Sequence, residues 1–293
     1  MVANPTPSAR AGRPRLQADC ASCFGLCCVA LPFTASADFA IDKEAGQPRL
    51  HLRADFRCGI HALLRERGFP GCAVFDCFGA GQQVSQVTFG GRDWREAPHT
   101  ATQMFAIFPI VRQLHELLWY LTEALRMPAA RPIQHDLHRA LIRAERLTNG
   151  SPEELAAMDT AALRAIVNPL LQQTSELVRA AVPGRKRRHH GTDLVGANLK
   201  GADLRAADLH GAYLIAADLR DADLRLADLR GADLRNADLS GCSLTDAIFL
   251  TQPQINSAKG DLVTRLPAML RRPPHWERRR ASSRTSPRSG SPA

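Results

Sequence analysis

The chain has 293 residues, enough for two domains of ordinary size, and 45% of them are hydrophobic although only 5% are aromatic. No apolar run follows the charged start, and the longest apolar stretch, 104–111, is far short of the roughly 20 residues of a membrane-spanning helix, so we expect a cytoplasmic protein that does not bind membranes. The net charge of +9 does not by itself indicate a nucleic-acid-binding protein, because the basic excess lies in the flanking segments 185–190 and 271–293, where it predicts weak binding at most.

Cysteines dominate the first part of the chain that we expect to fold, 18–95, after a disordered segment at 1–17. Seven of the eight cysteines lie in it, at Cys20, Cys23, Cys27, Cys28, Cys58, Cys72 and Cys77. Disulfides are disfavoured in a cytoplasmic protein, and the βαβ context of a thioredoxin-like CxxC is missing. Metal ligation remains, and the number of thiols is compatible with either zinc or an iron–sulfur cluster. His51 and His61 are additional candidate ligands.

The spacing C-x2-C-x-G-x-C-C at 20–28 resembles the CxxCxxxCC family of zinc- or iron-chelating cysteine-cluster domains. The resemblance covers about residues 16–80, and it implies that Cys58 and Cys72, in "CGIHALLRERGFPGC", complete the ligand set. The chain departs from the family in having "GFPG" before the later cysteine and in lacking one intermediate cysteine. Some relatives are linked to protein methylation, so the resemblance keeps an iron–sulfur or zinc-dependent protein-modifying enzyme as an alternative function.

The glycine-rich stretch 78–82, "FGAGQ", lacks the Lys-Ser/Thr of a phosphate-binding loop and the full dinucleotide-binding spacing. We expect it to form a turn. No Ser–His–Asp arrangement and no paired carboxylates are evident, so the sequence favours a protein that is not an enzyme without deciding the question.

A helical region is expected at 99–182, where apolar residues recur at spacings of three and four. Pro109 should kink or break its first helix, and Ser151 should cap a helix that starts at Pro152. Further helices are predicted at 133–147 and 160–182, before a basic linker at 183–191.

Residues 192–251 consist of twelve consecutive five-residue units without insertion. Leu stands at the centre of eleven units and Phe249 at the centre of the last, while Ala opens ten of them. A period of five fits neither a helix nor a strand, but it fits a coil that turns a corner at every unit and stacks on itself, with Leu pointing inward. Internal repeats of this regularity indicate a repeat architecture.

The units, such as "ADLRG" and "ADLRN", closely resemble the pentapeptide-repeat family, A(D/N)LXX. The resemblance implies a right-handed quadrilateral β-helix with four units per coil, so that 192–251 would form three coils. It places Cys242 in a small inward position as a buried thiol, outside any metal site. A C-terminal cap is expected at 252–276, with Thr251 as a helix N-cap, followed by a disordered basic tail at 277–293.

Some members of this family protect DNA gyrase by imitating the acidic surface of DNA, which makes gyrase a candidate partner. The repeat carries ten Asp, no Glu and six Lys or Arg, a net charge of −4 spread evenly over its sides. Mimicry of a polyanion needs a sustained negative face, so this balanced surface argues against it. One side departs from the polar pattern at Val195, Tyr213 and Ile215, which we expect to contact either the protein's own helices, the slightly favoured alternative, or a partner protein.

The predicted architecture is therefore multidomain: a small Cys-rich metal domain, an α-helical region, and a C-terminal right-handed quadrilateral β-helix. The predicted function is that of a metal-stabilised adaptor or regulatory protein that binds a macromolecular partner, with a gyrase-protecting protein and a metal-dependent modifying enzyme as alternatives. The oligomeric state does not follow from the sequence.

Overall fold

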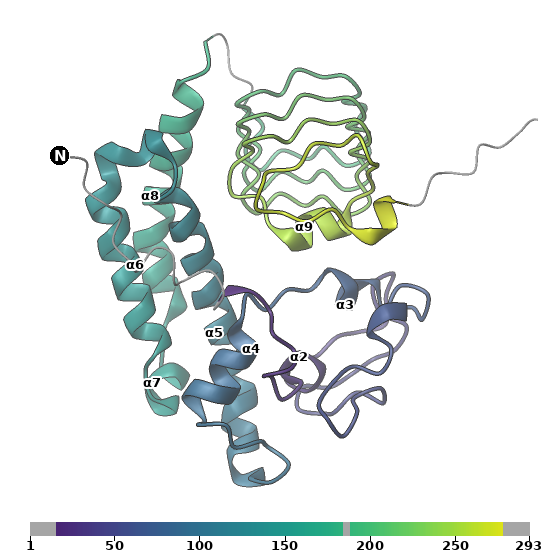
Figure 1. Ribbon diagram of the computed structural model, residues 1–293, viewed down its shortest axis with the longest axis vertical. Coiled ribbons are helices and arrows are strands. Elements are labelled where there is room, and N and C mark those ends of the chain that lie inside the picture. The colour runs from purple at the N-terminus through teal and green to yellow at the C-terminus, as the bar shows by residue number, and fades with distance from the viewer. Residues whose placement is uncertain (1–15, 184–187, 278–293) are drawn as a thin grey trace, which may run out of the picture.

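The structure is a computed structural model that describes residues 16–183 and 188–277. Three parts lie side by side: a bundle of long helices, a stack of coils, and an N-terminal part made of loops and short helices (Figure 1). The helix α9 lies at the end of the coil stack that faces the N-terminal part, and it contacts α3 there. None of the described helices is long and apolar enough to cross a membrane.

The N-terminal part contains little regular structure. Its elements are α2 (Leu26–Val29), η2 (His61–Leu63), α3 (Pro70–Val74), α4 (Ala80–Gln82) and the π-helix η3 (Gln83–Thr88). Isolated antiparallel bridges join Phe33 to Lys43 and Leu52 to Cys58. The turn predicted at 78–82 is confined to Phe78 and Gly79, because Gly79, with φ at 80°, is the N-cap of α4 and the chain continues from there as a helix.

The bundle is built around α5 (Pro98–Ala124), which contacts α6 (Gln134–Thr148), α7 (Pro152–Ala156) and α8 (Thr160–Ala180), while η4 (Pro128–Ile133) connects α5 to α6. The predicted helix start at Pro152 is confirmed, since the Ser151 hydroxyl accepts a hydrogen bond from the Glu154 N–H at 3.2 Å. A break at Pro109 is wrong, because α5 runs through this residue. Fully buried Phe108 and Val111 flank the proline, so packing of the helix compensates for the missing hydrogen bond.

His115 lies in the middle of α5 and is buried in the bundle. Its Nδ1–H donates to the carbonyl oxygen of Phe78 at 2.7 Å, which ties α5 to the N-terminal part. Burial lowers the pKa of His115 to about 4, because the charged imidazolium would lose its hydration there.

Acid should therefore weaken the fold through His115. In the unfolded chain the imidazole takes up a proton near its usual pKa of 6.5, whereas in the folded chain it does so only near 4, so stability falls as the pH drops through this window. The shift corresponds to about 3 kcal/mol. We expect His115→Asn, which retains a donor for Phe78 but does not titrate, to lose less stability than the wild type between pH 6.5 and 4 in urea unfolding followed by circular dichroism. Parallel pH profiles for the two proteins would contradict this.

The coil stack is held by parallel bridges between residues twenty apart, such as Asp193 with Tyr213 and Asp203 with Asp223. Twenty residues are four five-residue units, so four units make one turn of the coil, as expected. The bridges involve single residues and no longer strands are assigned in the described part of the repeat. The central Leu side chains from Leu204 to Leu244 are buried, as is Cys242, which confirms the inward column. The fifth position of each unit forms the corner, where Ala206 and Gly211 have positive φ.

A cap covers the C-terminal end of the stack. It begins with α9 (Gln252–Ser257) after the N-cap residue Thr251, whose N–H donates to the Gln254 side chain at 2.8 Å, and it ends with η5 (Pro274–Trp276). Lys259 bridges to Asp238 and Arg265 bridges to Ser243, so the cap continues the ladder of the last coil. Its Trp276 is 2% exposed and closes the apolar core.

The helical bundle packs on one side of the stack, and it is not the side that the sequence suggested. The contacted side carries Asp208, Asp228 and Arg230, which are buried against α8. Val195, Tyr213 and Ile215 lie on the neighbouring side, where Val195 is 55% and Tyr213 52% exposed. Contact of this patch with the protein's own helices, the favoured alternative, is therefore wrong. Contact with a partner protein stays a prediction.

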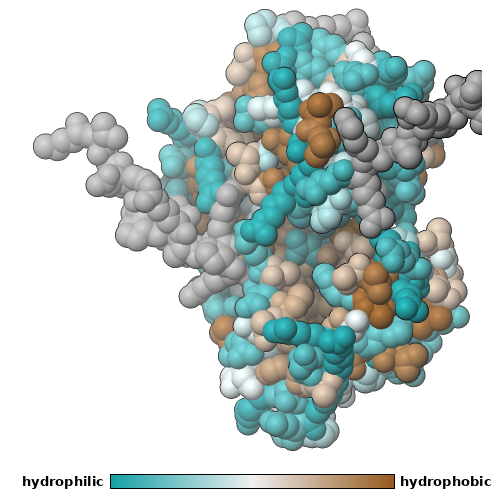
Figure 2. Space-filling model, turned by 45° about the vertical axis from the view of Figure 1, so that its right-hand side comes forward, coloured by the Kyte–Doolittle hydropathy of each residue, from teal (hydrophilic) through white to brown (hydrophobic). Residues whose placement is uncertain are grey.

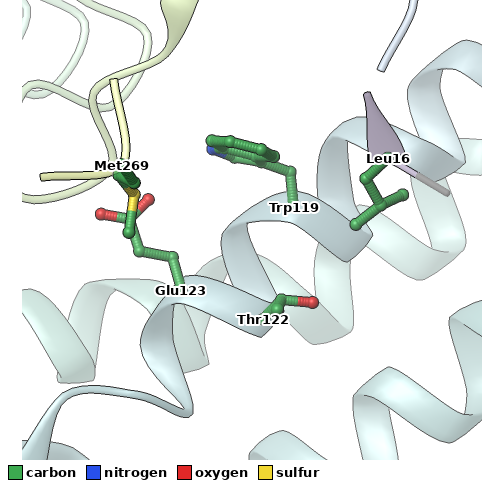
Figure 3. Close-up of a pocket in the computed structure, with 5 residues that line it drawn as sticks. All are labelled: Leu16, Trp119, Thr122, Glu123 and Met269. Atoms are coloured by element: carbon green, nitrogen blue, oxygen red, sulfur yellow. The ribbon is translucent and has the colours of Figure 1, made fainter. Parts of the chain in front are cut away.

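A second contact joins α5 to the end of the stack and its cap. Figure 3 shows Trp119 and Glu123 on α5 pointing toward Met269 of the cap. The buried Glu123 carboxylate accepts a hydrogen bond from the N–H of Phe249 at 2.9 Å, and Tyr120 packs edge-on against the ring of Phe249. The small pocket at this junction leaves no room for a water molecule, so it is a packing contact and offers no ligand site.

Candidate metal centre

The seven N-terminal cysteines come from three segments that are far apart in sequence. Cys20 and Cys23 precede α2, which carries Cys27 and Cys28; Cys58 stands in the bridge with Leu52; Cys72 lies on α3 and Cys77 just before α4. All are free thiols, as is Cys242 in the repeat. The fold thus brings together every cysteine that the sequence singled out and keeps Cys242 apart, in the core of the stack.

Four of these cysteines form one set, called here the four-thiol group: Cys20, Cys23, Cys27 and Cys77. Burial raises the pKa of Cys23 to about 11, and the charges of Cys77 and Cys20 add to the rise. The pKa of Cys77 is raised by burial, by Asp76 and by Cys20, and that of Cys27 by its hydrogen bond to Cys28, by burial and by Cys23 and Cys77. These mutual effects indicate that the four thiols belong to one neighbourhood, in which Cys28 also raises the pKa of Cys20. Several thiolates together are unfavourable there unless a cation is present.

The other three, Cys28, Cys58 and Cys72, form the three-thiol group, which surrounds a basic residue. Arg49, only 7% exposed, donates from Nη1 to the Cys72 sulfur at 2.9 Å and stacks on the Phe69 ring at 4.3 Å. The hydrogen bond from Cys27, followed by the charges of Arg49 and Lys43, lowers the pKa of Cys28 to about 7. The groups adjoin where the Cys27 and Cys28 sulfurs lie 3.9 Å apart.

Backbone N–H groups point at three of the sulfurs. Cys23 accepts from Leu26 and Gly25, Cys77 from Gly81 and Gly79, and Cys58 from Ile60. Such hydrogen bonds favour the thiolate, which is the form that binds a metal. The glycines are required by this geometry, since Gly25 and Gly79 have φ of 66° and 80°.

Gly81 also leaves space beside the four-thiol group. A Cβ at this position would lie 2.6 Å from the Cys23 sulfur and 3.8 Å from the Cys77 sulfur. A side chain larger than hydrogen would therefore displace Cys23. The glycine-rich stretch 78–82 thus belongs to the cysteine cluster, a role that its CxGxG pattern after Cys77 could have indicated.

The cysteines offer the sulfur donors that zinc and iron–sulfur clusters use. In the described ranges 16–183 and 188–277, no three His, Cys, Asp or Glu side chains already stand as ligands around one point. Zinc–sulfur bonds of about 2.3 Å in a tetrahedron place sulfurs about 3.8 Å apart, and the Cys27 and Cys28 sulfurs, which belong to different groups, lie 3.9 Å apart. The residue types, their grouping and the N–H donors fit a thiolate-bound metal, although the other sulfurs would have to close in on it. His51 packs edge-on to Phe69 and His61 lines a groove, so neither is placed among the thiols.

Sequence analysis did not identify Arg49 and Lys43 as part of this cluster. Lys43 is 8% exposed and donates to the carbonyl oxygens of Val29 and Leu31 at 2.9 and 2.7 Å. Both basic residues are separated from the cysteines in sequence and have no motif, so only the fold shows that they lie beside Cys28 and Cys72.

Comparison with known proteins identifies the family of the repeat and a relative that matches most of the chain. The family described as "Pentapeptide repeats" matches eight copies within residues 190–221 and 207–246. A solved pentapeptide repeat protein from the thylakoid lumen of Arabidopsis thaliana is 30% identical and covers 32% of this chain, which in turn spans 62% of that protein, with a TM-score of 0.23, too low to carry an argument about the fold. The resemblance of residues 16–80 to the cysteine-cluster family stays a prediction.

A curated protein from Bacillus subtilis (strain 168), named "Uncharacterized protein YybG", is 59% identical over 265 residues, which cover 89% of this chain and 95% of the relative. The match extends far beyond the repeat, so the N-terminal part and the helices are shared as well. The chain is a pentapeptide-repeat protein that belongs to the family of YybG.

Proposed function

We propose that this protein is a non-enzymatic, metal-stabilised adaptor or regulatory protein that binds a macromolecular partner through its pentapeptide-repeat scaffold. The metal site is inferred from seven cysteines that come from distant segments into one part of the fold, with backbone N–H groups directed at Cys23, Cys58 and Cys77. The absence of disulfides among them suits a reducing, cytoplasmic location.

The four-thiol group is the better candidate for the main ligand set. It supplies four sulfurs, the number that both a structural zinc site and an iron–sulfur cluster need, whereas the three-thiol group supplies three and faces the cation Arg49. When bound, either metal would cross-link the loops of a domain that has little regular structure. Cys20, Cys23, Cys27 and Cys77 would hold it, while Gly79 and Gly81 would orient Cys77.

For the repeat, we propose the right-handed quadrilateral β-helix that the family resemblance implies, supported by parallel bridges twenty residues apart. Four of the ten Asp residues in the repeat are paired with an Arg two positions later: Asp203 with Arg205, Asp218 with Arg220, Asp223 with Arg225 and Asp233 with Arg235. These ion pairs neutralise the carboxylates, which favours a protein-binding scaffold over gyrase inhibition by imitation of DNA. The exposed patch Val195, Tyr213 and Ile215 is the candidate contact for a partner protein.

The proposal is tested by elemental analysis and an absorption spectrum of the full chain purified without oxygen. We expect about one zinc ion per chain, or iron and sulfide with visible absorption, bound tightly enough to survive gel filtration. A folded protein that carries neither metal after purification from metal-supplemented cells would overturn the metal-stabilised part of the proposal.

A further inference from the structure

A groove runs between the N-terminal part and the C-terminal cap, at the place where α3 contacts α9. One wall is the segment from His61 to Glu66 together with Ala73, and the other is Asn256 with Pro273, Pro274 and His275. Its volume is about 390 Å³, and it is open to solvent. The view in Figure 2 brings this side of the molecule forward, with a recessed surface between two lobes that carries both hydrophobic and hydrophilic side chains.

The groove combines an apolar lining with a positive group that has no acidic partner. Leu63 is 40% exposed in it, which leaves apolar surface for a ligand. Arg65 donates from Nη2 to the backbone carbonyl of Asn256 across the groove, and none of the described carboxylates forms an ion pair with it. Partial burial lowers the pKa of Arg65, so its guanidinium has lost hydration that an anion would replace.

The imidazole of His275 forms part of the opposite wall. The Nε2–H of His275 donates to the Ala258 carbonyl at 2.9 Å, which holds the ring in place. Burial, together with the charge of Arg65, lowers the pKa of His275, so the ring is neutral at pH 7 and Arg65 is the positive group of the groove. Arg271 and Arg272 precede the proline wall in sequence, and residues 278–293 hold five arginines and no acid.

We propose that this groove binds a short acidic peptide segment of the partner protein, with a carboxylate on Arg65 and an apolar side chain against Leu63 and Pro273. The inference rests on the proposed adaptor function and gives it a binding site outside the repeat. Charge complementarity and the apolar wall both suit a peptide, in which carboxylates alternate with apolar side chains.

Other occupants fit the groove less well. The apolar wall offers no contact to the closely spaced phosphates of a nucleic acid, and a single guanidinium pairs with only one of them. The chain's own residues 278–293 are basic, so Arg65 would repel them.

The test is fluorescence anisotropy of the full-length protein with a labelled peptide of alternating Glu and Leu residues, beside its Gln–Leu counterpart and a labelled RNA oligonucleotide. We expect the Glu peptide to bind at least about tenfold more tightly than the Gln peptide, and Arg65→Glu to remove this preference. Arg92→Glu, an equal charge change at an exposed position outside the groove, should leave it unchanged. Because Arg65 also joins the walls, Arg65→Glu is assayed with a Lys–Leu peptide, which it should bind in place of the Glu peptide.

Equal loss in both Glu variants, no preference for the Glu peptide, or an Arg65-dependent preference for RNA would each overturn the proposal. Leu63→Glu offers a second variant that leaves the Arg65 hydrogen bond intact, and it should weaken binding of the Glu peptide to a similar degree. Metal content is measured on the same samples. A metal-loaded protein that does not bind the Glu peptide refutes the groove proposal alone. A metal-free protein that still binds the Glu peptide refutes the metal proposal alone.

Discussion

Replacing Cys23 with serine is expected to abolish tight metal binding and to unfold the N-terminal part of the chain. The substitution removes the sulfur that receives the Gly25 and Leu26 N–H groups and that borders Gly81. Structural zinc contributes about 10–16 kcal/mol to small domains that it folds. The part of the chain that would lose it has only short helices and packs a few residues, such as Leu26, Val29 and Val84, into the core of the helical bundle. The loss should therefore exceed the stability that packing alone gives this part.

The measurements are the metal-to-protein ratio after gel filtration and hydrogen exchange of residues 18–95. Exchange should become fast there in Cys23→Ser, while the repeat keeps its protection, because its Leu column forms a separate core. The helix α5 shares its core with Leu26, Val29 and Val84, so it should lose part of its protection. Two variants serve as controls. Cys242→Ala changes a thiol in the repeat to the residue that opens most other units, and it should retain full metal content. Cys72→Ser removes a member of the three-thiol group, and it should lose less metal than Cys23→Ser.

Equal metal content in Cys23→Ser and the wild type would refute this assignment. A larger loss in Cys72→Ser than in Cys23→Ser would instead place the metal at the three-thiol group.

Local patterns in the sequence predicted much of the fold, because they record local physics. The five-residue period fixed the coil, since every unit must turn a corner and bury its Leu, and the structure has both features. Ser151 and Pro152 predicted a helix start because a hydroxyl acceptor and a residue without an N–H satisfy that position locally. Pro109 misled because tertiary packing of α5 outweighs the local cost of an interior proline.

Contacts between the parts could not be predicted in the same way. The repeat presents nearly the same residues on each side, so the period does not show which side the helices cover. Val195, Tyr213 and Ile215 departed from the pattern by being apolar and remained outside the interface. The covered side departs from it at His210 and in the last unit, where Ile248, Phe249 and Leu250 replace the usual Asp, Leu and Arg. Its burial of Asp208, Asp228 and Arg230 depends on polar partners on α8 that have no sequence signature.

The second large effect is expected on stability, from substitution of these buried polar residues at the interface between α8 and the repeat. The Arg179 guanidinium lies 3.4 Å from the Asp208 carboxylate, with side chains 6% and 10% exposed, and its Nε donates to the Ala206 carbonyl at 3.0 Å. Beside it, Asp228 is fully buried and accepts a hydrogen bond from the Ser175 side chain. Burial raises the pKa of Asp228, whose Oδ1 accepts a hydrogen bond from the Arg230 N–H at 2.9 Å while its Oδ2 has no hydrogen-bond partner among the described residues.

Arg179→Met should therefore destabilise the protein by about 3–5 kcal/mol, because it leaves the Asp208 carboxylate buried without its cation. The repeat supplies a matched control in Arg205→Met, which breaks an ion pair of 2.7 Å whose side chains are 48% and 59% exposed. Exposed pairs contribute about 0–1 kcal/mol, so this variant should stay close to the wild type in urea unfolding. The second substitution Asp208→Asn, added to Arg179→Met, removes the unpaired charge but keeps an oxygen for the His210 N–H, and it should restore part of the lost stability. We attribute the cost of Arg179→Met to the burial of its ion pair, so the exposed pair of Arg205 and Asp203 should contribute less stability although its distance is shorter. Equal losses of stability in the two Arg→Met variants would contradict this.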